Sequence, residues 1–221
     1  MKLNRYIKES NTSVLDKYDD FIDSVRAQCK PWLKAISSCK IKHCIRGYNP
    51  KDVIEKRTPR KDRKPRDTPK DIQASLDDEF SKKFGWKVRS EGLFTWGGRI
   101  TGGYGTAAGI VFPTGNFDFV WSKKVYDLFM YYDKSYKPSG MKDSEEEIEY
   151  RKEWVKRTID TYTNKNLCEA LSSTSEIVIK CNSYWIIRKN FLHNMYDPPG
   201  DLLEREKFSK FIEDVLIRGN V

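Results

Sequence analysis

Histidines, paired cysteines and long apolar runs are scarce in this chain of 221 residues. Its two histidines, His43 and His193, are too few for a histidine-rich metal centre, so we expect no metal. The cysteines are odd in number and scattered, without a CxxC pair, which favours free thiols over a disulfide framework or a zinc site. They are Cys29, Cys39, Cys44, Cys168 and Cys181. The sequence therefore predicts a protein of a reducing cytoplasm.

Several standard motifs are also missing. No apolar run approaches the length that spans a bilayer, and the first five residues lack the apolar core of a signal peptide, so we expect no membrane partner. The glycine-rich segment 92–105 matches neither a Walker A motif nor the dinucleotide GxGxxG pattern. It prevents a regular helix and indicates backbone that lies close to something. Hydrolysis by a metal or by a nucleophile–base pair lacks its usual parts.

What remains is enough for a packed core. Hydrophobic residues make up 38% of the chain and aromatic residues 13%, against 33% charged residues. This length suits a single domain, 1–221. We expect a helical segment at 1–38, a core at 40–190 and a final helix at 198–221. The order of helices and strands, at irregular intervals, favours an α+β fold over a regular βαβ array.

Hydrophobic spacing and capping residues predict the individual elements. A first helix starts at Thr12-Ser13, and Pro31 should kink or split it. A helix capped by Thr68-Pro69 ends at Gly85, and another starts at Asp143 or Ser144. Strands are expected at 40–48, 107–113 and 116–122, a short helix at 167–172, and a strand hairpin at 176–187. The tryptophans assigned to the core are Trp32, Trp86, Trp121 and Trp154.

A basic segment runs from Glu55 to Asp67, with seven Lys/Arg against three acidic residues, four of the nine net positive charges. Three prolines and the absence of apolar residues from Arg57 to Lys70 predict an exposed, extended loop. The loop either binds nucleic acid, an acidic protein or a phosphate-bearing ligand, or is solvated and keeps the chain soluble. Its candidate binding residues are Arg57, Arg60, Lys61, Arg63, Lys64 and Arg66.

A carboxylate at the head of an apolar strand is the strongest functional indication. Glu176 precedes the apolar run 177–179, and an ionised group in such a place normally needs compensation. Far upstream, Arg46 ends another apolar stretch and Gly47 follows it. The two charges could face one cleft. Alternatively, Glu176 is a surface residue on an edge strand, and Arg46 pairs with any of the 32 acidic residues.

The two charges suggest a definite chemistry. A single carboxylate can stabilise the oxocarbenium-like transition state of glycosidic cleavage. An arginine beside it can hold a phosphate by bidentate hydrogen bonds. A cationic leaving group, a sugar and a phosphate together describe NAD cleaved at the bond between nicotinamide and ribose.

Three motifs, in the expected order, resemble those of the R-S-E class of ADP-ribosyltransferases, which includes bacterial toxins and phage enzymes. Ile45-Arg46-Gly47-Tyr48 is similar to the first strand of that family, and Phe94-Thr95-Trp96 to its second motif. Ser175-Glu176-Ile177-Val178-Ile179 is similar to its third, a strand headed by glutamate. The resemblance spans residues 43–187. It implies a split β-sheet core with N-terminal and peripheral helices.

The resemblance also implies roles for these residues. Arg46, with Gly47 beside it, would bind the phosphate and the nicotinamide ribose of NAD. Thr95 would orient the glutamate or contact the ribose. Glu176 would hydrogen-bond the ribose 2′-hydroxyl and stabilise the oxocarbenium ion. The other expected NAD-binding residues are aromatic: Phe94 packing beneath the strand, and Trp96 or Tyr104 stacking on nicotinamide.

The implied activity is NAD-dependent mono-ADP-ribosyl transfer to a host macromolecule by a phage or viral protein, in the host cytoplasm or carried in the virion. Thr174 stands two residues before Glu176, where many members of the family carry Glu or Gln to position an acceptor. The acceptor therefore stays open between host protein and nucleic acid. The alternative is a non-enzymatic protein on the same fold, associated with the virion or with nucleic acid, that uses the basic loop at 56–66.

Overall fold

The strands that the structure describes form one sheet of eight, in which every pair of neighbours is antiparallel. The computed structural model describes residues 12–40, 42–47, 52–63, 68–97, 108–138, 140, 144–188 and 212–217. The strand order is β2-β8-β4-β1-β3-β7-β5-β6. The strands are β1 (Cys44–Gly47), β2 (Ile54–Arg57), β3 (Leu93–Gly97), β4 (Ala108–Pro113), β5 (Asp118–Ser122), β6 (Tyr162–Thr163), β7 (Glu176–Lys180) and β8 (Tyr184–Arg188). With the surrounding helices, this arrangement makes the fold α+β.

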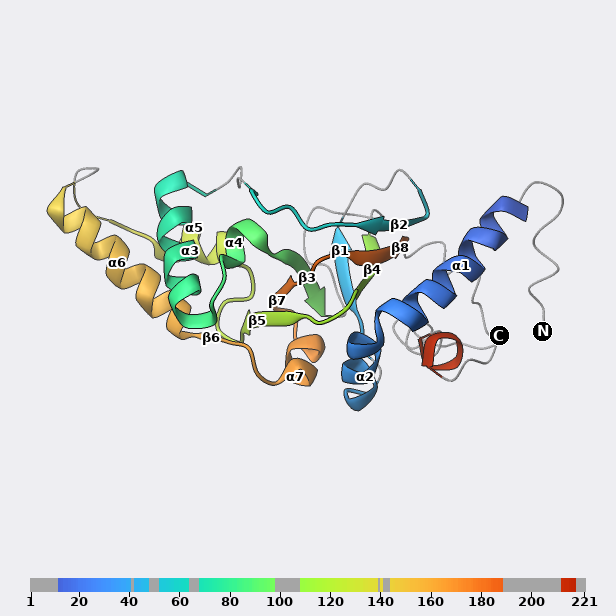
Figure 1. The fold of residues 1–221 in the computed structure, drawn as a ribbon. Helices are drawn as coiled ribbons and strands as arrows, with labels where there is room; N and C mark the ends of the chain where they lie inside the picture. Colours follow the sequence, from blue (N-terminus) through green and yellow to red (C-terminus); the bar gives the residue numbers. More distant parts are fainter. Residues whose placement is uncertain are drawn as a thin grey trace.

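Helices gather at the two ends of the sheet (Figure 1). At one end lie α1 (Thr12–Gln28), α2 (Lys30–Ser38) and the short π-helix η2 (Ile212–Ile217), and at the other α3 (Lys70–Phe84), α5 (Leu128–Ser135) and α6 (Glu145–Asp160). Two further short helices are α4 (Val88–Glu91) and α7 (Leu167–Ser172). The helices divide the buried side chains into two hydrophobic cores.

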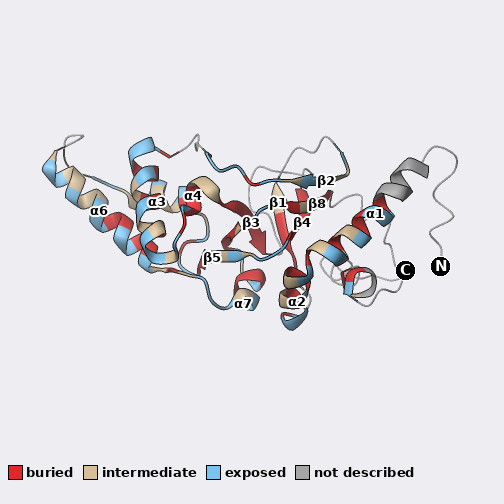
Figure 2. Ribbon diagram, viewed as in Figure 1, coloured by how far each residue is buried: buried red, intermediate tan, exposed pale blue. Residues whose placement is uncertain are grey.

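The two cores lie against opposite faces of the central strands. Successive residues of a strand point to opposite faces, and β7 follows this rule. Ile177 and Ile179 belong to the core beneath α1 and α2, and Val178 to the core beneath α3 and α6. The central strands are accordingly buried on both sides (Figure 2). The four tryptophans assigned to the core are all buried, which confirms that prediction.

The predicted hairpin at 176–187 is wrong, although both of its strands are present. β7 pairs with β3 and β5, whereas β8 pairs with β2 and β4. β4 and β5, which also follow each other in sequence, likewise separate to the two halves of the sheet. These pairs of strands, although consecutive in sequence, therefore part at their connecting turns. As a result β1, β3 and β7, which carry the three motifs, lie side by side at the centre.

Most predicted helix boundaries agree with the structure. The first helix is split just before Pro31, with Cys29 between α1 and α2. α3 ends at Gly85, whose φ of 80° is the left-handed conformation that favours glycine. Ser144 caps α6 by accepting a hydrogen bond from the Glu147 N–H, at 3.2 Å. α3 differs, because it begins at Lys70 with Pro69 in the cap position and no capping side chain. Of the predicted last helix, only residues 212–217 are among those described.

The prediction of five free thiols is wrong, because Cys39 and Cys168 form a disulfide. It joins the end of α2 to α7, and its partners are 129 residues apart in sequence, so their spacing gave no sign of it. Cys29, Cys44 and Cys181 are free. Burial raises the pKa of each of these three to about 12, which keeps them as unreactive thiols.

Part of the predicted basic loop is also ordered as a strand. Ile54–Arg57 forms β2, which pairs with β8 at the edge of the sheet. Charged side chains are common on edge strands because they discourage pairing with other chains, so the charge of this segment did not exclude a strand. Among the described helices, none combines the length and the apolar character that a bilayer crossing requires.

Candidate functional site

Glu176 occupies the first position of β7, in the middle of the sheet. Its exposed fraction is 7%, and β7 lies between β3 and β5, so the alternative of a surface carboxylate on an edge strand is wrong. Its backbone N–H donates to the Tyr126 carbonyl at 2.7 Å, which fixes the start of the strand. The Leu128 N–H, the first of α5, donates to the carboxylate. A helix N-terminus is a favourable place for a negative charge.

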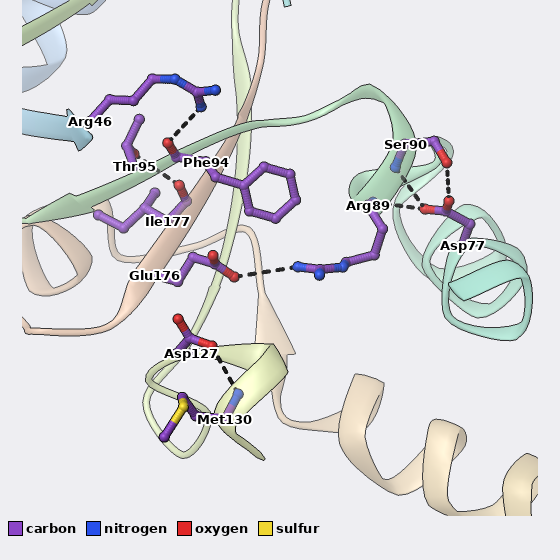
Figure 3. Close-up of polar contacts among 10 residues, drawn as sticks. All are labelled: Arg46, Asp77, Arg89, Ser90, Phe94, Thr95, Asp127, Met130, Glu176 and Ile177. Carbon is purple, nitrogen blue, oxygen red and sulfur yellow. Dashed lines mark hydrogen bonds and ion pairs between the residues drawn. The ribbon is translucent and has the colours of Figure 1, made fainter. Parts of the chain in front are cut away.

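Arg89 is the cationic partner of Glu176. Its Nη1 lies 3.7 Å from Oε2 of Glu176, and both side chains are less than a tenth exposed (Figure 3). That distance is an ion pair but exceeds a hydrogen bond. Arg89 Nε is buried and finds no hydrogen-bond acceptor among the described residues. The pair is therefore close, but it leaves hydrogen-bonding capacity on the arginine.

Asp77 of α3 holds the short helix that carries Arg89. Its Oδ1 accepts from the backbone N–H groups of Arg89 at 2.7 Å and Ser90 at 3.3 Å, and its Oδ2 accepts from the Ser90 hydroxyl (Figure 3). These are the free N–H groups of the first turn of α4, which has no capping side chain of its own. A carboxylate from a neighbouring helix thus fixes the point from which Arg89 reaches Glu176.

The protonation of Glu176 is poised near neutrality. The pKa of the carboxyl group is raised from 4.5 to about 7, mainly by burial and also by the negative charge of Asp127. Arg89, Arg63 and the Leu128 N–H act in the opposite direction. Near pH 7 the group is therefore a mixture of carboxylate and carboxylic acid, a state typical of functional sites.

Phe94 connects this pair to the basic segment. The guanidinium of Arg89 lies over the Phe94 ring, 4.8 Å from its centroid, and the guanidinium of Arg63 lies over the same ring at 4.0 Å. Such cation–π contacts hold a cation where the surroundings are apolar. Arg63 also contributes to the electrostatics of Glu176. Two arginines, one aromatic ring and one carboxylate therefore form a charge cluster on one side of β3.

Arg46 and Thr95 lie on the other face of the sheet from Glu176, because Ile45, the neighbour of Arg46, is directly opposite Trp96, which is itself opposite Glu176. Arg46 Nη1 donates to the Phe94 carbonyl at 2.9 Å, just beyond the two described residue pairs that join β1 to β3. Thr95 is fully buried, and its Oγ1 donates to the Ile177 carbonyl at 2.8 Å. Thr95 therefore binds the backbone of β7 at Ile177, one residue after Glu176, and does not contact the Glu176 carboxylate.

The register of the strands decides which expected side chains share a face. Trp96 is directly opposite Glu176, and Thr95 is opposite Ile177. Since alternate residues point to opposite faces, Glu176 and Trp96 lie on one face of the sheet and Thr95 on the other. The structure brings Glu176, Phe94 and Trp96 to one face, and separates Arg46 and Thr95 from the carboxylate.

Two glycines near the predicted site, Gly47 and Gly97, lie within strands. Gly47 ends β1, opposite Ala108. At Gly97 an added Cβ would stand 2.5 Å from the Leu171 carbonyl oxygen, so only glycine lets α7 approach β3 this closely. This agrees with the expected close approach of the glycine-rich segment. Tyr104 lies outside the described residues.

The basic residues have different environments. Arg57 Nε donates to the Glu55 carboxylate at 2.5 Å, and Arg63 stacks on Phe94, so both are engaged within the chain. Arg60 and Lys61 are exposed. Lys64 and Arg66 lie outside the described residues. The segment is thus partly built into the fold, and the described part does not behave as a uniform solvated loop.

Sequence reasoning missed Arg89 and Asp127. Arg89 lies in a short segment between two glycine breaks, where no periodic pattern assigns a face. Asp127 had a weak signal, because an Asp before an apolar run can cap a helix. In the structure its Oδ1 accepts from the Met130 N–H at 3.0 Å, at the start of α5. Within the described ranges no cluster of His, Cys, Asp or Glu is placed to hold a metal ion.

Comparison with known proteins adds no relative to this geometry: the chain matches no protein-family model, no curated protein and no solved structure at a significant level.

Proposed function

We propose that this chain is an NAD-dependent mono-ADP-ribosyltransferase, which cleaves the bond between nicotinamide and ribose and transfers ADP-ribose to a host macromolecule. The observation that carries the proposal is Glu176, a buried carboxylate in the strand next to β3, with Arg89 at 3.7 Å. This buried ion pair supports the proposal together with the resemblance of the three motifs to those of ADP-ribosyltransferases. The strands that carry the motifs, β1, β3 and β7, are neighbours in the sheet.

In this proposal the ionised form of Glu176 stabilises positive charge. The bond between the ribose C1′ and the nicotinamide nitrogen breaks, and nicotinamide leaves with the bonding electrons as a neutral molecule. The ribose becomes an oxocarbenium ion, which an acceptor nucleophile attacks from solution as it loses a proton. A fixed carboxylate in a water-poor site stabilises such an ion more than one in bulk water does.

The arginines supply the counterpart for the diphosphate. A planar guanidinium suits phosphate because it can donate two parallel hydrogen bonds. Arg46, at the end of β1, is the arginine that the family resemblance assigns to this role. Arg89 supports the same chemistry, since its Nε lacks an acceptor among the described residues and its guanidinium is buried over Phe94.

The proposal is tested by incubating the protein with labelled NAD and a cell lysate. We expect free nicotinamide and labelled macromolecule with the wild-type chain, and neither with Glu176→Ala. Arg46→Lys is expected to raise KM more than it lowers kcat, because it weakens substrate binding. Wild-type protein that neither releases nicotinamide nor labels any macromolecule would refute the proposal.

A further inference from the structure

A cleft of about 500 Å³ opens between α3, the turn before α4 and the described end of the basic segment. Its lining is made of charged and polar side chains, with a single apolar residue. The lining residues are Lys61, Asp62, Arg63, Lys70, Gln73, Ala74, Asp77, Asp78, Lys87 and Ser90. Cavities of this size hold small organic ligands. None of Arg46, Thr95 and Glu176 lines it, although the cleft adjoins the charge cluster of Glu176 through Arg63 and Asp77.

Four cations give the cleft an affinity for anions. Lys61, Lys70 and Lys87 are exposed and form no ion pair within the part of the chain that the structure describes. Arg63 is held in place, because its backbone N–H donates to the Ser90 carbonyl at 3.2 Å and its guanidinium stacks on the Phe94 ring. The cleft thus combines one fixed cation with three that can move toward a ligand.

The remaining lining groups are acceptors. Asp77 is occupied by three hydrogen bonds from Arg89 and Ser90, whereas Asp62 and Asp78 are exposed. These two carboxylates weaken the attraction of the four cations for an inorganic anion. A ligand that also carries hydroxyl or amino groups would instead donate hydrogen bonds to them.

Gln73 provides a second, independent indication of a ligand with donor groups. Its exposed fraction is only 8%, and its Nε2 donates to the Arg63 carbonyl at 2.8 Å. That bond assigns the opposite atom, Oε1, as an acceptor, and Oε1 is buried with no hydrogen-bond donor among the described residues. An unpaired buried acceptor is unfavourable, so a shift of the Gln73 side chain that brings Oε1 to a ligand donor at this wall of the cleft would relieve it.

We infer that the cleft is a binding site for a nucleoside monophosphate or a closely similar sugar phosphate. Arg63 and the three lysines bind the phosphate, and Asp62, Asp78 and Gln73 accept hydrogen bonds from the sugar hydroxyls and amino groups. This inference goes beyond NAD cleavage, and either can fail without the other.

Equilibrium dialysis with AMP tests the inference, using the full chain. We expect saturable binding, with adenosine and inorganic phosphate each binding more weakly because each lacks half of the recognised groups. The variant K70Q/K87Q should bind AMP at least about tenfold more weakly than the wild type. The control K152Q/K156Q changes two exposed lysines on α6, outside the cleft, and should bind as the wild type does.

Three outcomes would overturn it: no saturable AMP binding to the wild type, equal AMP binding by K70Q/K87Q, or loss of AMP binding in R46Q with no loss in K70Q/K87Q. The last would place AMP at the proposed NAD site. All four lysines are exposed, so the variants should fold, and their thermal unfolding midpoints check this.

Discussion

Arg89 and Glu176 form an ion pair in which both side chains are almost fully buried, with 3.7 Å between Nη1 and Oε2. Removing one partner of such a pair lowers the free energy of unfolding by more than the intact pair contributes to it, because the other charge is left buried and uncompensated. The pair nevertheless does not hold Glu176 fully ionised, since burial still raises the pKa of the carboxyl group to about 7.

Replacing Arg89 by Gln is predicted to raise the pKa of Glu176 above 7, because Arg89 is the largest influence that lowers it. A carbon-13 NMR titration of the glutamate side chains measures this pKa without requiring activity. Arg157→Gln, a change at an exposed arginine of α6, is the control and should leave the titration of Glu176 as it was. A Glu176 midpoint that is unchanged or lower in Arg89→Gln would contradict the proposed partnership.

The raised pKa also predicts how stability depends on pH. Because the folded value, about 7, lies above the ordinary 4.5, the folded state binds more protons than the unfolded state between these values. The contribution of Glu176 to the free energy of unfolding is therefore fully present below pH 4.5 and is lost as pH rises through 7, roughly 3 kcal/mol in all. Urea unfolding at a series of pH values measures it.

Glu176→Gln cannot ionise and should lose that part of the pH dependence. Glu153→Gln, at an exposed position on α6, should keep it. Equal slopes in the two variants between pH 4.5 and 7 would show that Glu176 does not titrate in this window.

Thr95 is predicted to stabilise the junction of β3 and β7. Thr95→Val keeps the shape of the side chain but removes the 2.8 Å hydrogen bond to the Ile177 carbonyl. We expect a loss of about 1 kcal/mol in the free energy of unfolding, measured by urea denaturation. Thr58→Val, at an exposed position, should change it by less than about 0.5 kcal/mol. If both variants lose the same amount, the hydrogen bond contributes nothing measurable.

The disulfide should stabilise the chain substantially. It joins Cys39 to Cys168 across 129 positions, and closing so long a loop restricts the unfolded state strongly. A reductant is predicted to lower the free energy of unfolding by about 2–4 kcal/mol. The variant C39S/C168S should show the same loss and no further response to reductant. Wild-type stability that does not respond to reductant would mean that the bridge is absent in solution.

Local sequence signals predicted the elements well and their partners poorly. Pro31, Gly85 and Ser144 act on their own neighbours, so the helix boundaries that they set could be inferred from the chain alone. Strand pairing depends on residues far apart in sequence. The chain alone shows only that β7 and β8 are consecutive, which favours a hairpin, and not that each pairs with distant strands. The disulfide could not be predicted either, because its two cysteines are 129 residues apart in sequence.

The candidate site was predicted in part. Glu176 stood out because a charge at the head of an apolar strand needs compensation, and the structure gives that compensation in Arg89 and the Leu128 N–H. The sequence assigned the compensation to Arg46, because its place beside a strand was visible. Arg89 reaches Glu176 only because Asp77, on another helix, fixes the turn that carries it. Such a dependence on three separate elements leaves no local pattern.

The most direct test of the proposed activity measures NAD binding and NAD cleavage separately in the wild type and in Glu176→Gln. If Glu176 stabilises the oxocarbenium ion, the variant should bind NAD within a few-fold of the wild type, while nicotinamide release falls about 100-fold or more. Nicotinamide release at the wild-type rate from the variant would contradict the account.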